Sequence, residues 1–230
     1  MKQLVTTAIV LSRTNYGEAD RIIMVVTPDY GKLRLMAKGV RRIKSKLAGG
    51  IELFSVSDIT YIQGRSEICT LVSTRLQVHY PQIMTDINRV QLGYELIKLL
   101  NKATEDEVEA DYFHLLHAAF EALNDVTIPD VLIRLWFSAQ LLTLSGHSPN
   151  LKTDTAGLAL QSSERYTFDL NDMTASPNAN GNFGASHIKL LRLLFGGMVP
   201  RVIVHVTGYS EVLPECASLV QAMLQTHGRV

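Results

Sequence analysis

Cysteines, long apolar runs and secretion signals are scarce or absent in this sequence. Cys69 and Cys216 are the only two cysteines among 230 residues. Two distant cysteines in a cytosolic chain are more often buried thiols than a disulfide. No run approaches the roughly 18–20 apolar residues that a membrane-spanning helix needs, and the N-terminal stretch has no apolar signal core. With 47% apolar and 19% charged residues, we expect an ordinary globular protein of the cytoplasm.

Recognisable catalytic motifs are missing too. The sequence has neither a Gly-x-Ser-x-Gly elbow nor a His-Glu-x-x-His motif. Gly31-Lys32 is no phosphate-binding loop, because the upstream glycine is absent and leucine follows. His114 and His117 lie three residues apart on a predicted helix and could share a face, but we interpret them as packing or surface histidines. These absences favour a binding protein over an enzyme and predict no catalytic residue and no cofactor.

Net charge is zero, but the charges are unevenly distributed. The chain has 22 basic and 22 acidic residues. Residues 1–46 contain ten basic and three acidic residues, a net charge of +7, so residues 47–230 carry −7. A positive end attracts a polyanion and orients its docking.

The positive charge is concentrated in residues 31–46, which hold seven Lys or Arg side chains and no acid. Leu33, Leu35 and Ala37 alternate with longer or charged neighbours, as in a half-buried strand. Residues 38–46 show no alternation, which predicts a flexible basic loop. A cationic strand face leading into such a loop suits a phosphate backbone, whereas the alternative is a solvated charged loop. The candidate contacts are Lys32, Arg34, Lys38, Arg41, Arg42, Lys44 and Lys46.

Short β-rich segments surround this stretch. The predicted strands are residues 6–11, 21–27, 31–37, 54–62 and 68–74. Five strands with Gly-rich turns in about 75 residues predict a small antiparallel barrel. Five strands and a basic face fit an OB-fold, which binds single strands across one face. We therefore assign residues 1–80 to an OB-fold nucleic-acid-binding domain.

Two tyrosines lie in predicted turns at the ends of these strands. Tyr16 and Tyr30 flank the basic strand, and exposed aromatic rings beside cations can stack on bases, with about 1–3 kcal/mol per base. The alternative is that a turn tyrosine packs over the end of the barrel. Both residues are candidate nucleic-acid contacts.

The apolar period changes to three and four residues after Pro81, which predicts helices. The three predicted apolar stripes are Ile83, Ile87, Val90, Tyr94 and Ile97; Tyr112, Leu116, Ala119 and Leu123; and Leu132, Leu135, Trp136, Ala139 and Leu142. An acidic connection, residues 104–111, separates the first two. Pro129 opens the third helix, and Gly146 and Pro149 end it. Short connections predict a bundle.

Residues 150–185 are polar and rich in loop-forming residues, with one strand-like piece at 165–169. A further helix follows, with Ser186 as the expected N-cap and Gly196-Gly197 as its end. A last helix is expected over residues 214–227. We assign residues 81–149 and 186–230 to one α-helical domain interrupted by an insertion at 150–185.

Several motifs together resemble a known family. Residues 7–11, 16–21, 30–33 and 37–47, with Phe54 beyond, match the N-terminal domain of the RecO family of bacterial DNA repair proteins in order and spacing. This similarity extends through about residue 80. Arg134-Leu135-Trp136, Leu141-Leu142 and Gly146-His147-Ser148-Pro149 resemble the family's third bundle helix and its ending.

The resemblance implies an α+β protein: an N-terminal five-stranded OB-fold barrel, then an α-helical bundle domain with a zinc-finger-like insertion. It implies binding of single- and double-stranded DNA and annealing of complementary strands. Its implied partners are the C-terminal tail of single-stranded DNA-binding protein, RecR, often RecF, and indirectly RecA. The implied location is the cytoplasm, in association with the nucleoid. Arg134 is our candidate cation for the tail; the alternative is a structural ion pair.

The insertion departs from the family pattern. Many relatives carry two Cys-x-x-Cys pairs that bind zinc, but the corresponding residues 151–157 and 174–179 contain no cysteine. Zinc needs about four Cys or His donors. We therefore expect an insertion that keeps its shape without a metal.

The predicted function is that of a non-enzymatic recombination mediator. One alternative is an OB-fold RNA-binding module without annealing activity. A second alternative is an enzyme with its active site in the helical half, although no motif points to one.

Overall fold

The computed structural model describes residues 2–104 and 109–228, and it has the predicted α+β fold class. The chain divides into two compact units, Met1–Asn124 and Asp125–Val230. Most of the predicted acidic connection, residues 105–108, lies outside the described residues. In the part of the chain that the structure describes, no helix is both long and apolar enough to cross a membrane.

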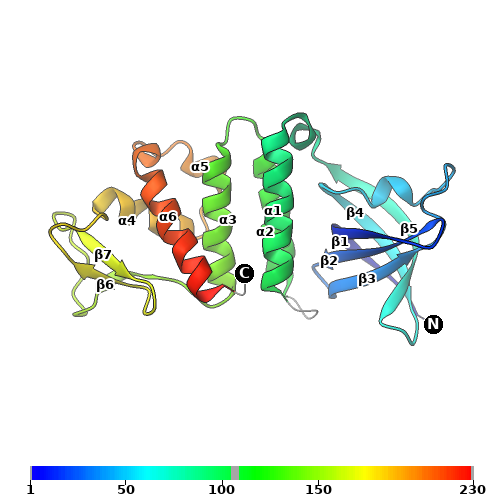
Figure 1. The fold of residues 1–230 in the computed structure, drawn as a ribbon, viewed down its shortest axis with the longest axis horizontal. Helices are drawn as coiled ribbons and strands as arrows, with labels where there is room; N and C mark the ends of the chain where they lie inside the picture. Colours follow the sequence, from blue (N-terminus) through cyan, green and yellow to red (C-terminus); the bar gives the residue numbers. More distant parts are fainter. Residues whose placement is uncertain (1, 105–108, 229–230) are drawn as a thin grey trace. The chain divides into compact units, whose positions relative to one another are not determined.

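The first unit begins with a closed five-stranded barrel (Figure 1). Its strands are β1 (Lys2–Tyr16), β2 (Asp20–Thr27), β3 (Gly31–Ala37), β4 (Ser55–Gln63) and β5 (Ile68–His79), with the order β1-β2-β3-β5-β4. All five predicted strands are confirmed, although β1 and β5 are longer than expected. The prediction of a purely antiparallel barrel was wrong, because β3 and β5 pair in parallel. These two strands lie far apart in the sequence, so no local pattern shows whether they pair in parallel or antiparallel.

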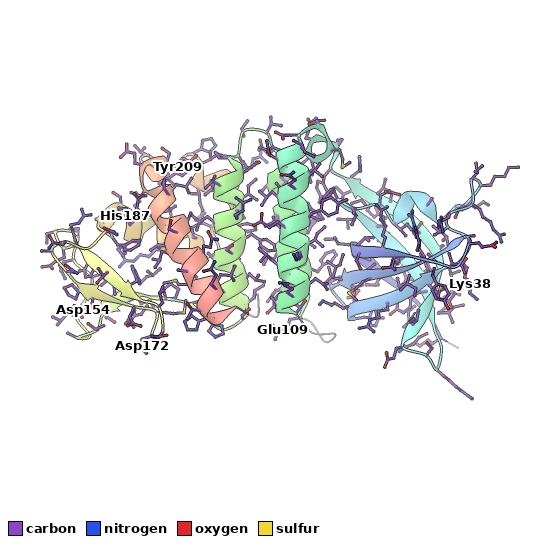
Figure 2. The ribbon with its side chains drawn as sticks, viewed as in Figure 1. Lys38, Glu109, Asp154, Asp172, His187 and Tyr209 are labelled. Atoms are coloured by element: carbon purple, nitrogen blue, oxygen red, sulfur yellow. The ribbon has the colours of Figure 1, made fainter. Side chains whose placement is uncertain are left out.

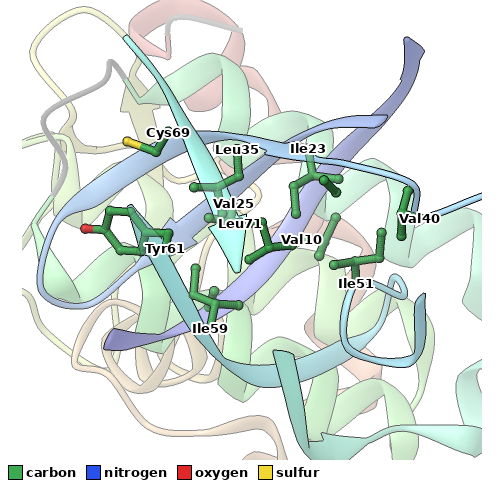
Figure 3. Packing of buried hydrophobic residues seen from close by; sticks show 12 residues of the cluster. Val10, Ile23, Val25, Leu35, Val40, Ile51, Ile59, Tyr61, Cys69 and Leu71 are labelled. Carbon is green, nitrogen blue, oxygen red and sulfur yellow. The ribbon is translucent and has the colours of Figure 1, made fainter. Parts of the chain in front are cut away.

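Inward-facing side chains from all five strands fill the barrel (Figure 3). Ile23, Leu35 and Ile59 are fully buried, as the alternation along each strand requires. The connection from β3 to β4 contributes Val40 and Ile51 to the same core. This connection, which contains the short helix η1 (Ala48–Gly50), therefore closes one end of the barrel.

Two helices pack beside the barrel within this unit, after a short turn η2 (Pro81–Thr85). They are α1 (Ile87–Ala103) and α2 (Ala110–Asn124). The predicted stripe on α1 was partly wrong, because Ile87 and Tyr94 are exposed while Leu92, Leu96 and Leu100 are buried. The ring of Phe54 lies against this part of α1, where it packs edge-to-face on the half-exposed Tyr94 at 5.4 Å between ring centroids. An added Cβ on Gly93 would lie 2.5 Å from Phe54 Cε1, so the glycine face turns toward the barrel.

The second unit contains the remaining helices. They are α3 (Asp130–Leu144), α4 (Ala185–Phe195), α5 (Pro200–Ile203) and α6 (Tyr209–His227). The predicted stripe of α3 is buried throughout, which confirms that helix. The N-cap of α4 is Gly184 rather than Ser186. The last helix begins at Tyr209, before the expected Pro214, and α5 was not predicted.

A three-stranded sheet forms the insertion, with the order β6 (Asn150–Asp154), β8 (Thr174–Pro177) and β7 (Tyr166–Asp169). Polar side chains close its turns. Asp154 Oδ1 accepts hydrogen bonds of 2.9 Å from the backbone N–H groups of Ala156 and Leu158. Asn178 Oδ1 accepts one of 2.9 Å from Asn180 N. Asp154 and His187 are labelled in Figure 2.

The predicted domain boundaries follow the change from strands to helices near residue 80. Packing instead divides the chain after Asn124, because α1 and α2 contact η2, β1 and β2 in the first unit. The predicted helical domain, residues 81–149 and 186–230, is therefore distributed over both units. Its assignment as one functional domain stays a prediction.

Candidate nucleic-acid interface

The basic stretch forms β3 and the loop that follows it. Leu35 and Ala37 are fully buried and Arg34 is exposed, so the predicted alternation is confirmed. We call residues 38–46 the basic loop. It lies on the side of the barrel away from α1 and α2, where Figure 2 labels Lys38.

Lys32 has a different environment from the other candidate cations. Its Nζ donates hydrogen bonds of 2.8 Å to the carbonyl oxygens of Asn101 and Thr104. These oxygens lie at the C-terminal end of α1, where helix carbonyls lack backbone partners and partial negative charge accumulates. The ammonium group therefore joins β3 to α1, and we leave Lys32 out of the proposed surface.

Arg34 lies beside an acidic residue. Its Nη1 is 4.0 Å from Glu67 Oε2, in an exposed pair. Both side chains line a groove of about 260 Å³ with Lys32, Gln63 and Cys69. The carboxylate of Glu67 makes this groove less favourable to phosphate than the basic loop, which contains no acid.

Both ends of the basic loop are fixed to the barrel. At its start, Gly39 N donates to Asp20 Oδ1 at 2.7 Å, and Arg41 N donates to Ala19 O at 2.9 Å. The buried Val40 packs into the core between these bonds. At its far side, Thr74 Oγ1 donates to Leu47 O at 3.3 Å. The loop is therefore hydrogen-bonded to the barrel at both ends, and its flexibility between these points stays a prediction.

Five cations of this loop are exposed. They are Lys38, Arg41, Arg42, Lys44 and Lys46. The ion pairs Arg13–Glu52 and Arg34–Glu67 both lie outside the basic loop. Five exposed cations in a loop that itself contains no acid make this end of the barrel the strongest candidate for binding a polyanion.

The structure separates the two candidate tyrosines. Tyr16 ends β1, has an exposed fraction of 55% and immediately precedes the Gly17–Ala19 turn that contacts the basic loop. Tyr30 lies in the turn at the other end of β2 and β3, about 20 Å along the strands. Its ring packs edge-to-face on Tyr61 at 6.1 Å. Tyr16 therefore joins the proposed surface and Tyr30 does not.

Burial is the main cause of the pKa shifts at the end of the barrel near Tyr30. It raises the pKa of Tyr61 to about 12, with smaller contributions from Tyr30, Cys69 and Asp29. It also raises the pKa of the Cys69 thiol. Both groups are neutral near pH 7, so neither adds charge for binding or catalysis.

The remaining candidates have plain structural surroundings. The rings of His114 and His117 contact Phe113, in agreement with the packing interpretation. Arg134 lies on the exposed side of α3, and its assignment to a partner stays a prediction. Among the described residues, no group of three or more His, Cys, Asp or Glu side chains is arranged to hold a metal ion.

Two features of the basic loop were missed in the sequence. Val40 packs into the barrel core and Asp20 accepts a hydrogen bond from Gly39 N at the start of the loop. These contacts form only when the barrel closes. Ile43 at its tip is fully exposed, and an isoleucine among cations outside any apolar period was a visible signal.

The strand order and the parallel β3–β5 pair define an OB-fold, a barrel whose first turn commonly contributes to oligonucleotide binding. Residues 1–76 match the family model described as recombination protein O N terminal. The chain is thus related to the RecO family, and its barrel is similar to the N-terminal domain of that family.

Relatives named DNA repair protein RecO extend the similarity into the helices. The chain is 33% identical over 144 residues to that of Halalkalibacterium halodurans, covering 62% of this chain and 56% of the relative. It is 31% identical over 148 residues to that of Dehalococcoides mccartyi, covering 64% and 58%. It is 30% identical over 164 residues to that of Alkaliphilus metalliredigens, covering 71% of this chain and 66% of the relative. The matched region spans little more than half the length of the first two relatives.

Proposed function

We propose that this protein is a recombination mediator in DNA repair that binds single- and double-stranded DNA and anneals complementary strands. The observation that carries the proposal is the basic loop, with five exposed cations and no acid, beside the first turn of an OB-fold barrel. Its relatives are named DNA repair proteins. No covalent step is needed for this role, so we propose a non-enzymatic activity.

Annealing follows from charge neutralisation. Two single strands repel one another through their phosphates, and this repulsion extends over about 8–10 Å at physiological salt. When two strands are bound, the five exposed cations of the basic loop contact phosphates of both; when one strand is bound alone, all five are available to it. The lowered repulsion lets complementary bases test their register, and Tyr16 stacks on an unpaired base.

The proposed partners follow the family resemblance. They are the C-terminal tail of single-stranded DNA-binding protein, RecR and, in some systems, RecF. The proposed outcome is loading of RecA on single strands coated by the binding protein. Arg134 is the candidate cation for the acidic tail, because it is on the exposed side of α3.

The test is annealing of two complementary fluorescent oligonucleotides, bare and coated with the cognate single-stranded DNA-binding protein. A loop variant carries Arg41→Glu, Arg42→Glu and Lys44→Glu. A control variant carries Lys98→Glu, Lys152→Glu and Arg201→Glu, which change the net charge equally at exposed positions elsewhere. We expect acceleration by the wild type and the control on both substrates, and its loss in the loop variant.

Equal loss in both variants would point to net charge rather than to the basic loop. Absence of acceleration by the wild type would overturn the annealing proposal. Binding of RNA in preference to DNA, without annealing, would favour the alternative of an OB-fold RNA-binding module.

A further inference from the structure

Ile43 is the most exposed large apolar side chain among the described residues, with an exposed fraction of 104%. It lies within the basic loop, where its neighbours on both sides, Arg42 and Lys44, are also exposed. Single exposed apolar residues are common on protein surfaces. The position of Ile43 is different, because the loop around it is hydrogen-bonded to the barrel at both ends and is otherwise cationic.

The backbone places Ile43 at the tip of a turn. Ser45 N donates to Arg42 O at 3.0 Å, which makes Ile43 and Lys44 the two central residues of a β-turn. The turn lies between the two fixed points of the loop, Arg41 N on Ala19 O and Leu47 O on Thr74 Oγ1. The turn therefore presents the isoleucine outward, between two points at which the loop is hydrogen-bonded to the barrel.

We propose that Ile43 inserts between neighbouring bases of the bound nucleic acid and separates them. This inference rests on the proposed function and adds a base contact to a surface of phosphate contacts. The cations on both sides of Ile43 favour binding of a polyanion. When that polyanion is a nucleic acid, the flat faces of its bases are the apolar groups that Ile43 can contact. Apolar wedges, isoleucine included, separate base steps in other DNA-binding proteins.

Placing Ile43 between two bases would let the basic loop change base stacking as well as neutralise phosphates. Phosphate contacts alone hold a strand without changing its base stacking. A wedge at the loop tip opens one step of a stacked single strand, so its bases become available to a complement. The same side chain leaves the stack when the new duplex forms, because pairing restores stacking.

The test measures the affinity of the full chain for a labelled single-stranded oligonucleotide and for an abasic one of equal length and charge. Ile43→Ser is compared with the wild type, with Ile43→Leu as the conservative variant. Val5→Ser changes another exposed apolar residue, with an exposed fraction of 64%, on β1. Ile43 is fully exposed, so both of its variants are expected to unfold at the wild-type temperature. Val5→Ser needs only to remain folded at the temperature of the binding measurement.

We expect Ile43→Ser to bind the normal oligonucleotide about tenfold more weakly, or about 1.4 kcal/mol, and the abasic one as tightly as the wild type does. Ile43→Leu and Val5→Ser are expected to retain wild-type affinity for both. A single 2-aminopurine in the normal strand reports base separation: its fluorescence rises on binding of the wild type and less with Ile43→Ser.

Equal affinities of wild type and Ile43→Ser for the normal strand would overturn the wedge while leaving the proposed function in place. An equal loss on the abasic strand would overturn it too, because a base contact cannot act without bases. Failure of the wild type to bind either strand would overturn both proposals. Binding to phosphatidylglycerol vesicles that depends on Ile43, with unchanged oligonucleotide affinity, would assign the isoleucine to a lipid surface instead.

Discussion

The side chain of Lys32 begins on the polar face of β3 and ends among the carbonyl oxygens of Asn101 and Thr104. We predict that Lys32→Met lowers the free energy of unfolding by about 1 kcal/mol, since a cation at a helix C-terminus contributes about 0.3–2 kcal/mol. Urea denaturation measures this change. The slope of DNA affinity against salt is expected to stay the same. A shallower slope would return Lys32 to the DNA contacts.

His187 is the residue for which we predict a pH effect on stability. Its Nδ1 accepts a 3.3 Å hydrogen bond from Gly184 N at the start of α4, which requires the neutral ring. Burial lowers the pKa of His187; Glu215 opposes the shift and Arg165 adds to it. The unfolded chain therefore binds the proton more readily, and stability falls as the pH drops below about 6.5, the ordinary pKa of histidine.

The measurement is thermal unfolding from pH 8 to pH 5. We expect a constant melting temperature above about pH 7 and a decline below about pH 6.5. His187→Asn keeps an acceptor near the position of Nδ1 but does not titrate, so its decline should be smaller. Parallel pH curves for the two proteins would show that other groups cause the acid sensitivity.

Among the elements, α1 depends on close approach to the barrel. An added Cβ on Gly93 would lie 2.5 Å from Phe54 Cε1, and Phe54 itself has a left-handed backbone with φ of 56°. We predict that Gly93→Ala destabilises the protein by about 1–3 kcal/mol through overpacking, despite the higher helix propensity of alanine. The control is Gly49→Ala, where an added Cβ meets no atom within 4 Å. A stabilised Gly93→Ala would contradict this packing.

The insertion is the element for which we predict independence from metal. Asp154 has an exposed fraction of 8%, and its Oδ1 closes the turn after β6. Asp154→Ala removes the acceptor of two backbone N–H groups and should cost about 1–3 kcal/mol, whereas Asp154→Asn keeps an acceptor oxygen. Thermal unfolding of the wild type with and without EDTA should coincide. A lower melting temperature in EDTA would show that a metal supports the fold.

For the whole molecule, the concentration of exposed cations in one loop predicts the salt dependence of binding. Five phosphate contacts to a single strand give a slope of log K against log salt of about −3.5. Arg41→Gln, Arg42→Gln and Lys44→Gln leave two loop cations, so the slope should become about −1.4. Gln substitutions at Lys98, Lys152 and Arg201 should leave it unchanged. A wild-type slope near zero would exclude the proposed phosphate contacts.

Much of this organisation is local and was predictable. The alternation of Leu33, Leu35 and Ala37 defined β3, and the stripe of α3 defined its buried face, because side-chain direction follows backbone periodicity. The face of α1 was less predictable. Exposed Ile87 and Tyr94 fit a helical period as well as the buried residues do, and only packing against distant segments decides which of these side chains are covered.

The five strands, the positive end of the chain and the cysteine-free insertion follow from residue types and their spacing, so they could be predicted. The parallel β3–β5 pair, the use of Lys32 within the fold and the hydrogen bonds that join the basic loop to the barrel appear only in the folded chain. Each of these depends on partners far apart in the chain, such as Leu47 and Thr74. Only the closed barrel brings such partners within hydrogen-bond distance, and it thereby fixes which cations and which apolar side chain face solvent.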